Sequence, residues 1–96
     1  MIKHVVLMKF KDGVEDEAFT KLENRLRALP EIIKVIRGYE FGLDVVCSER
    51  SYDFGLVSEF DDLPSLEAYQ CHPEHQKVVA LLKEICDDIR AVDFTC

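Results

Sequence analysis

The sequence predicts an α+β fold in which four strands form one antiparallel sheet and the helices cover a single face of that sheet. Two observations lead to this prediction. Apolar and polar residues alternate in residues 52–60 and a β-branched apolar run fills residues 2–10, whereas apolar residues recur at helical spacing in residues 15–29 and again after Pro73. The resulting order is βαββαβ, and right-handed crossovers place every helix on the same side of the sheet, which is the ferredoxin-like arrangement.

The first half of the chain contributes two strands and one helix. Residues 2–10 are too short for a free-standing helix and end at a Lys-Asp-Gly turn, so they predict a strand. Acidic residues open the stretch 15–29 and basic residues follow, which matches the polarity of a helix dipole. Pro30 is expected to end this helix. A second strand is predicted at roughly residues 35–41, followed by a polar loop at 44–51.

The second half repeats the pattern with a broken helix. Residues 52–60 alternate cleanly and predict the third strand. Asp62 is a suitable cap for a short helix, because its carboxylate can accept from the exposed N–H groups of the first turn. Pro73 disfavours helical geometry at His72 and can itself begin the next helix. Residues 89–95 are predicted to close the chain as the fourth strand.

Composition limits the classes of function. Ninety-six residues with 48% hydrophobic and 32% charged residues predict one folded domain that spans residues 1–96. The formal net charge of -7 argues against nucleic acid and against anionic lipid as partners. No stretch has the pattern of a secretory signal or the length of a membrane span, so the expected location is the cytoplasm. The four cysteines form no CxxC pair and are expected to be free thiols.

The strand faces predict a homodimer. Helices on one side of the sheet cannot also cover the apolar centre of the other side, which consists of Val5, Leu7 and Val57. Charged residues at the strand ends would form a polar rim around this centre. We therefore expect two copies to pack sheet against sheet, burying on the order of 1,600 Å² in total.

The inner face of the sheet predicts a small-molecule pocket. His4 shares its strand face with Met8, and the stretch from Tyr69 to His75 joins two helices and carries two more histidines. If the two side chains at its ends turn inward, they meet His4 in a pocket with apolar walls. Phe54, Leu56 and Met8 are the expected walls. Proton transfer is the chemistry that such a pocket supports, with a histidine as base and a tyrosine hydroxyl as hydrogen-bond donor to an enolate oxygen.

Each of these residues also has a simpler structural explanation. His4 can be a hydrogen-bonded core residue, and the ring of His72 can cap the following helix. Cys71, His72 and His75 have cramped spacing for metal ligands, so no metal site and no cofactor is predicted.

Several stretches resemble the stress-responsive α/β-barrel domain (Dabb) family. The resemblance is carried by Ile2–Leu7, by Tyr52–Phe60, by the run Tyr69-(x2)-His72-Pro73-Glu74-His75, and by Val92-Asp93-Phe94, and it covers nearly the whole chain. It implies a dimeric α/β barrel. Most members have no established activity, plant members are linked to stress and defence, and one branch is a cofactor-free polyketide cyclase.

In the cyclase branch, a tyrosine and a histidine of this run carry the chemistry. The matching residues here are Tyr69 and His75, and His4 would line the same pocket, with His72 beside it. The cyclase has another histidine where this chain has Phe54. The pocket of this chain would therefore have one polar group fewer.

The expected function is thus a cytosolic homodimer that binds a hydrophobic carbonyl or phenolic compound and, with His75 and Tyr69 as catalytic residues, isomerises or cyclises it. One alternative is a stress protein without enzymatic activity, in which dimerisation is the useful property. Another alternative is a cofactor-independent monooxygenase, which oxygen uptake with quinol substrates would reveal.

Overall fold

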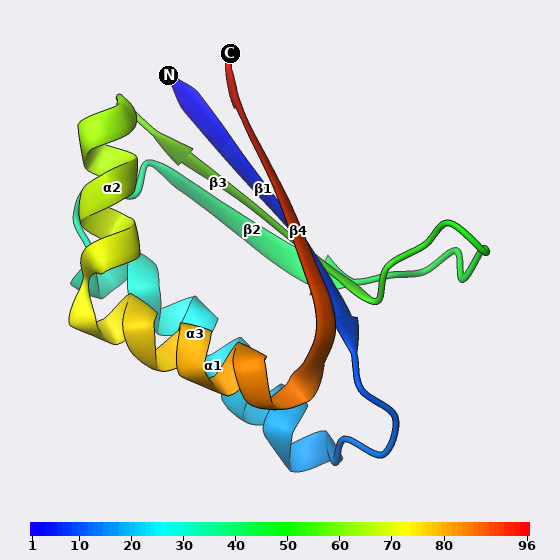
Figure 1. Cartoon of the computed structure of the whole chain (residues 1–96). Helices are drawn as coiled ribbons and strands as arrows, with labels where there is room; N and C mark the ends of the chain where they lie inside the picture. The colour runs from blue at the N-terminus through cyan, green and yellow to red at the C-terminus, as the bar shows by residue number, and fades with distance from the viewer.

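A computed structural model describes residues 1–96 and shows seven elements in the predicted βαββαβ order, with the second helical segment broken into two (Figure 1). The elements are β1 (Ile2–Phe10), α1 (Asp16–Ile32), β2 (Gly38–Leu43), β3 (Phe54–Phe60), α2 (Leu63–Cys71), α3 (Pro73–Ile85) and β4 (Cys86–Thr95). None of the three helices combines the length and hydropathy needed to cross a bilayer.

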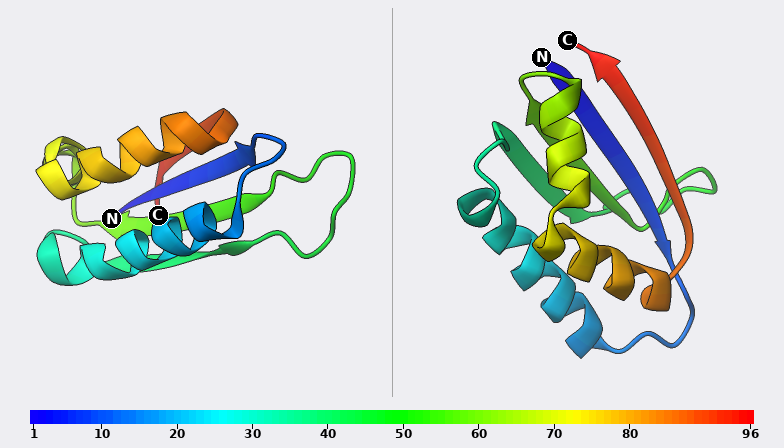
Figure 2. Two further views of the ribbon diagram at one scale, coloured as in Figure 1. Left: turned by 90° about the horizontal axis from the view of Figure 1, so that it is seen from below. Right: turned by 60° about the vertical axis from the view of Figure 1, so that its left-hand side comes forward.

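The four strands form one antiparallel sheet in the spatial order β2-β3-β1-β4. All three helices lie on one face of this sheet (Figure 1), and the two termini lie next to each other (Figure 2). The predicted fold class is therefore confirmed. On β1, Val5 pairs with Val57 of β3 on one side and with Val92 of β4 on the other.

The core lies between the inner sheet face and the helices. Leu22 and Leu26 of α1 are fully buried against it, and burial of such a side chain contributes about 1.5–3 kcal/mol relative to exposure. The strands supply their inward-facing residues, which are Val6, Met8, Phe54, Leu56 and Phe60. Only one face of each strand is used in this way, so the opposite face of the sheet has no helix above it.

Some boundaries differ from the prediction. Helix α1 continues past Pro30 to Ile32, because the proline removes one N–H while burial of Ile33 (3% exposed) keeps the last turn against the core. Its end is closed by the Ile33 N–H, which donates to the Leu29 carbonyl at 2.8 Å. Strand β2 consequently starts at Gly38, three residues later than predicted.

Strand β3 begins at Phe54 rather than at Tyr52, because Asp53 is used for a junction between strands. Its carboxylate accepts from the Phe10 N–H at 2.8 Å, and its own N–H donates to the Met8 carbonyl at 2.9 Å. Strand β4 begins at Cys86, earlier than predicted, because Cys86 pairs with Phe10 across a register shift in the β1–β4 ladder.

The break between α2 and α3 positions the functional stretch. The Asp62 carboxylate accepts from the Ser65 N–H at 2.9 Å, so Asp62 is the N-cap of α2, as predicted. His72 is the N-cap of α3, where its Nδ1 accepts from the Glu74 N–H at 3.1 Å. Together with Pro73 in the first turn, this cap sets where α3 starts.

Candidate functional site

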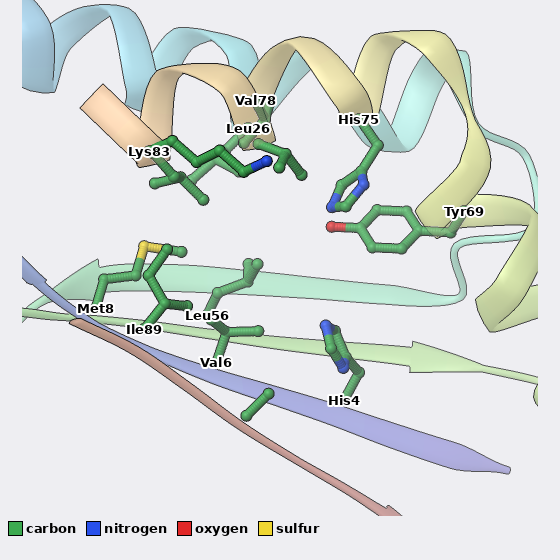
Figure 3. Close-up of a pocket in the computed structure, with 13 residues that line it drawn as sticks. His4, Val6, Met8, Leu26, Leu56, Tyr69, His75, Val78, Lys83 and Ile89 are labelled. Atoms are coloured by element: carbon green, nitrogen blue, oxygen red, sulfur yellow. The ribbon is translucent and has the colours of Figure 1, made fainter. Parts of the chain in front are cut away.

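An apolar cavity of about 240 Å³ lies between the sheet and helix α3 (Figure 3). Ten of its thirteen lining residues are hydrophobic. The lining consists of His4, Val6, Met8, Leu26, Leu56, Tyr69, His75, Val78, Val79, Leu82, Lys83, Ile89 and Ala91. Lys83 of α3 and Ile89 and Ala91 of β4 are exposed, so the cavity opens to solvent between these two elements.

His4 lies on the sheet floor of the cavity and is held by a carboxylate. It is 6% exposed, and its Nδ1 contacts the Asp93 Oδ1 of the neighbouring strand, to which it is paired in the β1–β4 register. A carboxylate can only accept, so Nδ1 carries the hydrogen and Nε2 is left as an acceptor. This pair fixes both the tautomer and the orientation of the ring.

Tyr69 lies opposite His4, at the end of α2, and is fully buried. Its hydroxyl oxygen is 2.8 Å from that of Tyr39 on β2. Burial raises the pKa of Tyr69 to about 12, which the bond to Tyr39 partly counteracts. Burial raises the pKa of Tyr39 as well, and its contact with Tyr69 adds to that rise. Both phenols therefore stay protonated, and when Tyr39 donates to Tyr69, the Tyr69 hydrogen is free to bond a ligand oxygen.

His75 lies in the first turn of α3, directly beside the Tyr69 ring. The two ring centroids are 4.2 Å apart, and Figure 3 shows the imidazole next to the Tyr69 hydroxyl. The His75 Nδ1 is 3.2 Å from the Gln70 carbonyl oxygen. A carbonyl only accepts, so Nδ1 donates and Nε2 carries the free lone pair.

The pKa of His75 is lowered, chiefly because burial disfavours its charged form. The hydrogen bond to Gln70 opposes this effect, while positive charge on His4 and His72 adds to it. The imidazole is therefore neutral at pH 7, with Nε2 available as a base at the wall of an apolar cavity.

The lowered pKa of His75 has a consequence for stability. Below pH 6.5 the unfolded chain binds a proton at this histidine more readily than the folded chain does. The contribution of His75 to the free energy of unfolding is therefore fully present above about pH 6.5 and is lost as the pH drops through the folded pKa. We expect the urea midpoint of the wild type to decrease over that range more than the midpoint of His75→Gln. Urea unfolding monitored by circular dichroism between pH 5 and 8 measures both, and parallel curves would contradict the prediction.

The structure brings five predicted site residues together in the cavity lining: His4, Met8, Leu56, Tyr69 and His75. The other two predicted ligand-binding residues, Phe54 and His72, lie outside this lining. Phe54 stacks on Phe41, with ring centroids 5.9 Å apart and planes at 19°, and so belongs to the packed core. The ring of His72 is occupied by its helix cap.

Three polar residues at the site were not predicted. Asp93 lies in the stretch Val92-Asp93-Phe94, but only the β1–β4 register places it beside His4. Tyr39 becomes a partner of Tyr69 through the position at which β2 starts. Lys83 could have been found from its position eight residues after His75, which puts both on one helix face. No three His, Cys, Asp or Glu side chains lie together in a way that could hold a metal ion.

The chain is similar in sequence to known proteins. The family model of the stress responsive A/B barrel domain (Dabb) matches residues 2–96. An uncharacterized protein from Streptomyces coelicolor is 38% identical over 87 residues, covering 88% of this chain and 89% of that protein. A stress-response A/B barrel domain-containing protein of Arabidopsis thaliana is 34% identical over 95 residues. That match covers 98% of this chain but only 36% of the plant protein, so the chain spans about a third of the length of this relative.

Among solved structures, a dimeric ferredoxin-like protein of unknown function from Thermobifida fusca superposes with a TM-score of 0.89. It is 30% identical, and the match covers 99% of this chain and 90% of that chain. Topology and sequence thus agree, and the chain belongs to the stress-responsive A/B barrel domain (Dabb) family.

Proposed function

We propose that this protein binds a small apolar compound with a carbonyl or phenolic oxygen in the cavity and catalyses proton transfer on it without a cofactor. The observation that carries the proposal is the convergence of His4, Tyr69 and His75 on one apolar cavity of about 240 Å³. Small-molecule sites are typically apolar with a few polar groups. Pockets for drug-sized ligands occupy about 300–1,000 Å³, which is more than this cavity, so the expected ligand is smaller than a drug-sized molecule.

The geometry assigns a role to each polar group. Nε2 of His75 removes a proton from the carbon next to the carbonyl, and the Tyr69 hydroxyl donates to the enolate oxygen that forms. In a β,γ-unsaturated ligand, the dienolate takes the proton back at the γ-carbon, which is isomerisation. In a ligand with a second carbonyl, the enolate attacks that carbonyl, which is aldol cyclisation. In the second case the protonated His75 returns its proton to the new alkoxide.

Tyr39 and His4 act in support of these two groups. Donation from Tyr39 at 2.8 Å keeps the hydrogen of Tyr69 directed at the ligand and makes Tyr69 a better donor. His4, held by Asp93, presents Nε2 on the floor of the cavity and can accept from a ligand hydroxyl or phenol.

The experiment that tests this proposal is a binding titration with 4-phenyl-2-butanone, an apolar ketone. We expect saturable NMR shifts of the Met8 methyl group and the His75 ring, because both line the cavity. Ala91→Phe places a ring at the cavity wall and should abolish these shifts without unfolding the protein, since Ala91 is exposed. A wild type that shows no saturable shift with this ketone, or the same shifts in Ala91→Phe, would contradict the proposal.

We propose in addition that the protein is a homodimer through the outer face of the sheet. Val5, Leu7 and Val57 form the centre of this face, and Val92 of β4 extends it. Leu7 is 41% and Val92 57% exposed. The single chain exposes 6219 Å², compared with about 5,650 Å² for a typical monomer of 11.1 kDa, and this excess supports a partner. The solved relative from T. fusca is described as dimeric.

The exposed face also favours the alternative in which assembly is the whole function. In that case the ketone binds without any acceleration of proton exchange, and the protein acts as a dimeric stress-response component. All four cysteines are free thiols, which supports placing either kind of dimer in a reducing compartment such as the cytoplasm.

A further inference from the structure

Lys83 adds a positive charge to the lining of the cavity. It follows His75 by eight residues on α3, which is about 12 Å along the helix axis. Figure 3 shows its side chain running back along the helix, so that the ammonium group lies over the cavity on the side of His75. The ammonium group and the His75 ring therefore face the same cavity from one helix.

This ammonium group has no partner in the protein. Lysines and arginines of the chain form five ion pairs with carboxylates, and Lys83 belongs to none of them. Two other lysines, Lys3 and Lys77, each lie within 4.0 Å of a glutamate. An ammonium that faces an apolar cavity without a carboxylate is free to pair with a charged ligand.

The rest of the lining has the same bias in charge. The chain carries 19 acidic and 12 basic residues, yet the thirteen lining residues include no aspartate or glutamate. Their ionisable side chains are His4, Tyr69, His75 and Lys83, none of which carries a negative charge. A cationic ligand would find no counterion here, whereas an anionic group would find one at Lys83.

We propose that the ligand is a small apolar keto acid, whose carboxylate pairs with Lys83 while its carbonyl lies between His75 and Tyr69. This inference rests on the function proposed above and adds the charge and polarity of the ligand to it. The apolar body of the ligand spans the middle of the cavity, against Val6, Leu56 and Val78.

A structural role for Lys83 makes a different prediction. Its aliphatic stem can cover apolar surface, and its charge suits the last turn of a helix. Neither role depends on the charge of a ligand. The deciding measurement is therefore the difference in affinity between a carboxylate and an uncharged compound of the same shape.

The experiment measures the dissociation constants of 4-(3-oxobutyl)benzoate, whose ring lies between its ketone and its carboxylate, and of its primary amide by calorimetry. A hydrogen bond to a charged group contributes enough for about tenfold tighter binding, so the wild type should prefer the acid by about that factor. Lys83→Met keeps the length of the stem and should remove the preference for the acid over the amide. Lys77→Met, an exposed lysine of the same helix outside the cavity lining, should keep the preference.

Two results would overturn the inference in distinguishable ways. Equal affinities of the wild type for acid and amide, or a preference that survives in Lys83→Met, would remove the role of Lys83 and leave the cavity as a binding site. Binding of neither compound would contradict the proposed cavity function and the inference with it.

Discussion

Replacing His75 with alanine should slow the exchange of the α-carbon hydrogens of 4-phenyl-2-butanone by about 100-fold to 10,000-fold, the range that general-base catalysis provides. The ring donates through Nδ1 to Gln70, so Nε2 is the base, and no other group in the lining is held both neutral and next to the Tyr69 hydroxyl. The measurement is the rate of deuterium incorporation in D2O at pD 7.5, followed by NMR at saturating ketone.

The roles of the neighbouring groups can be separated with matched variants. Tyr69→Phe removes the donor to the enolate oxygen and should cost about 100-fold to 1,000-fold in the same assay. His72→Ala is the control, because it removes a histidine three residues from His75 that is outside the lining. It should lower stability by about 0.5–2 kcal/mol through loss of the α3 cap and leave the rate at saturation unchanged.

Two results would contradict the assignment. The first is a His75→Ala variant that exchanges hydrogen at the wild-type rate while remaining folded and able to bind the ketone. The second is an equal loss in His72→Ala, which would show that the substitutions act through the helix junction. A wild type that binds the ketone but does not accelerate exchange would favour the non-enzymatic alternative.

The sequence predicted the fold well because its strongest signals are local. The alternation in residues 52–60 and the helical spacing in 15–29 each follow from the need to bury one face of an element. Boundaries were less accurate where tertiary contacts decide them. Pro30 has a local preference to end α1, but Ile33 is held against the core by contacts that the local sequence does not contain.

The candidate site was predictable only where one strand or one turn fixes it. His4 and Met8 share a face by alternation, and the Pro73 break turns His75 toward the cavity, so these residues could be named in advance. Contacts between segments that are distant in the sequence could not be predicted in this way. The contact of His4 with Asp93 depends on the β1–β4 register, over 89 residues of chain.

Phe54 lies on the inner face of the sheet, as alternation predicts, but outside the cavity lining. Its ring stacks on Phe41 and packs against Phe10, whose ring centroid is 6.0 Å away. Alternation gives the face of the sheet but not the position along it at which a cavity opens. The unoccupied space lies farther along the sheet, where small Ala91 leaves room beside Val6.

Replacing Val57 with aspartate should convert the dimer into folded monomers. Val57 lies at the centre of the outer face, between Val5 of β1 and Glu40 of β2. In a dimer packed sheet to sheet, the new carboxylate of each copy would be buried without a counterion and close to Glu40. Leaving a buried charge uncompensated costs about 3–5 kcal/mol, and the substitution occurs once in each copy.

The measurement is mass by light scattering after size exclusion at several concentrations, with a wild type at twice 11.1 kDa, or 22.2 kDa, and a variant at 11.1 kDa. Ala80→Asp adds the same charge at an exposed position of α3 and should stay dimeric. The inner face of β3 is unchanged, so the variant should keep its circular dichroism and its ketone binding. A folded Val57→Asp dimer with wild-type affinity would mean that the copies meet through another surface, and the apolar centre around Leu7 would then be without its partner.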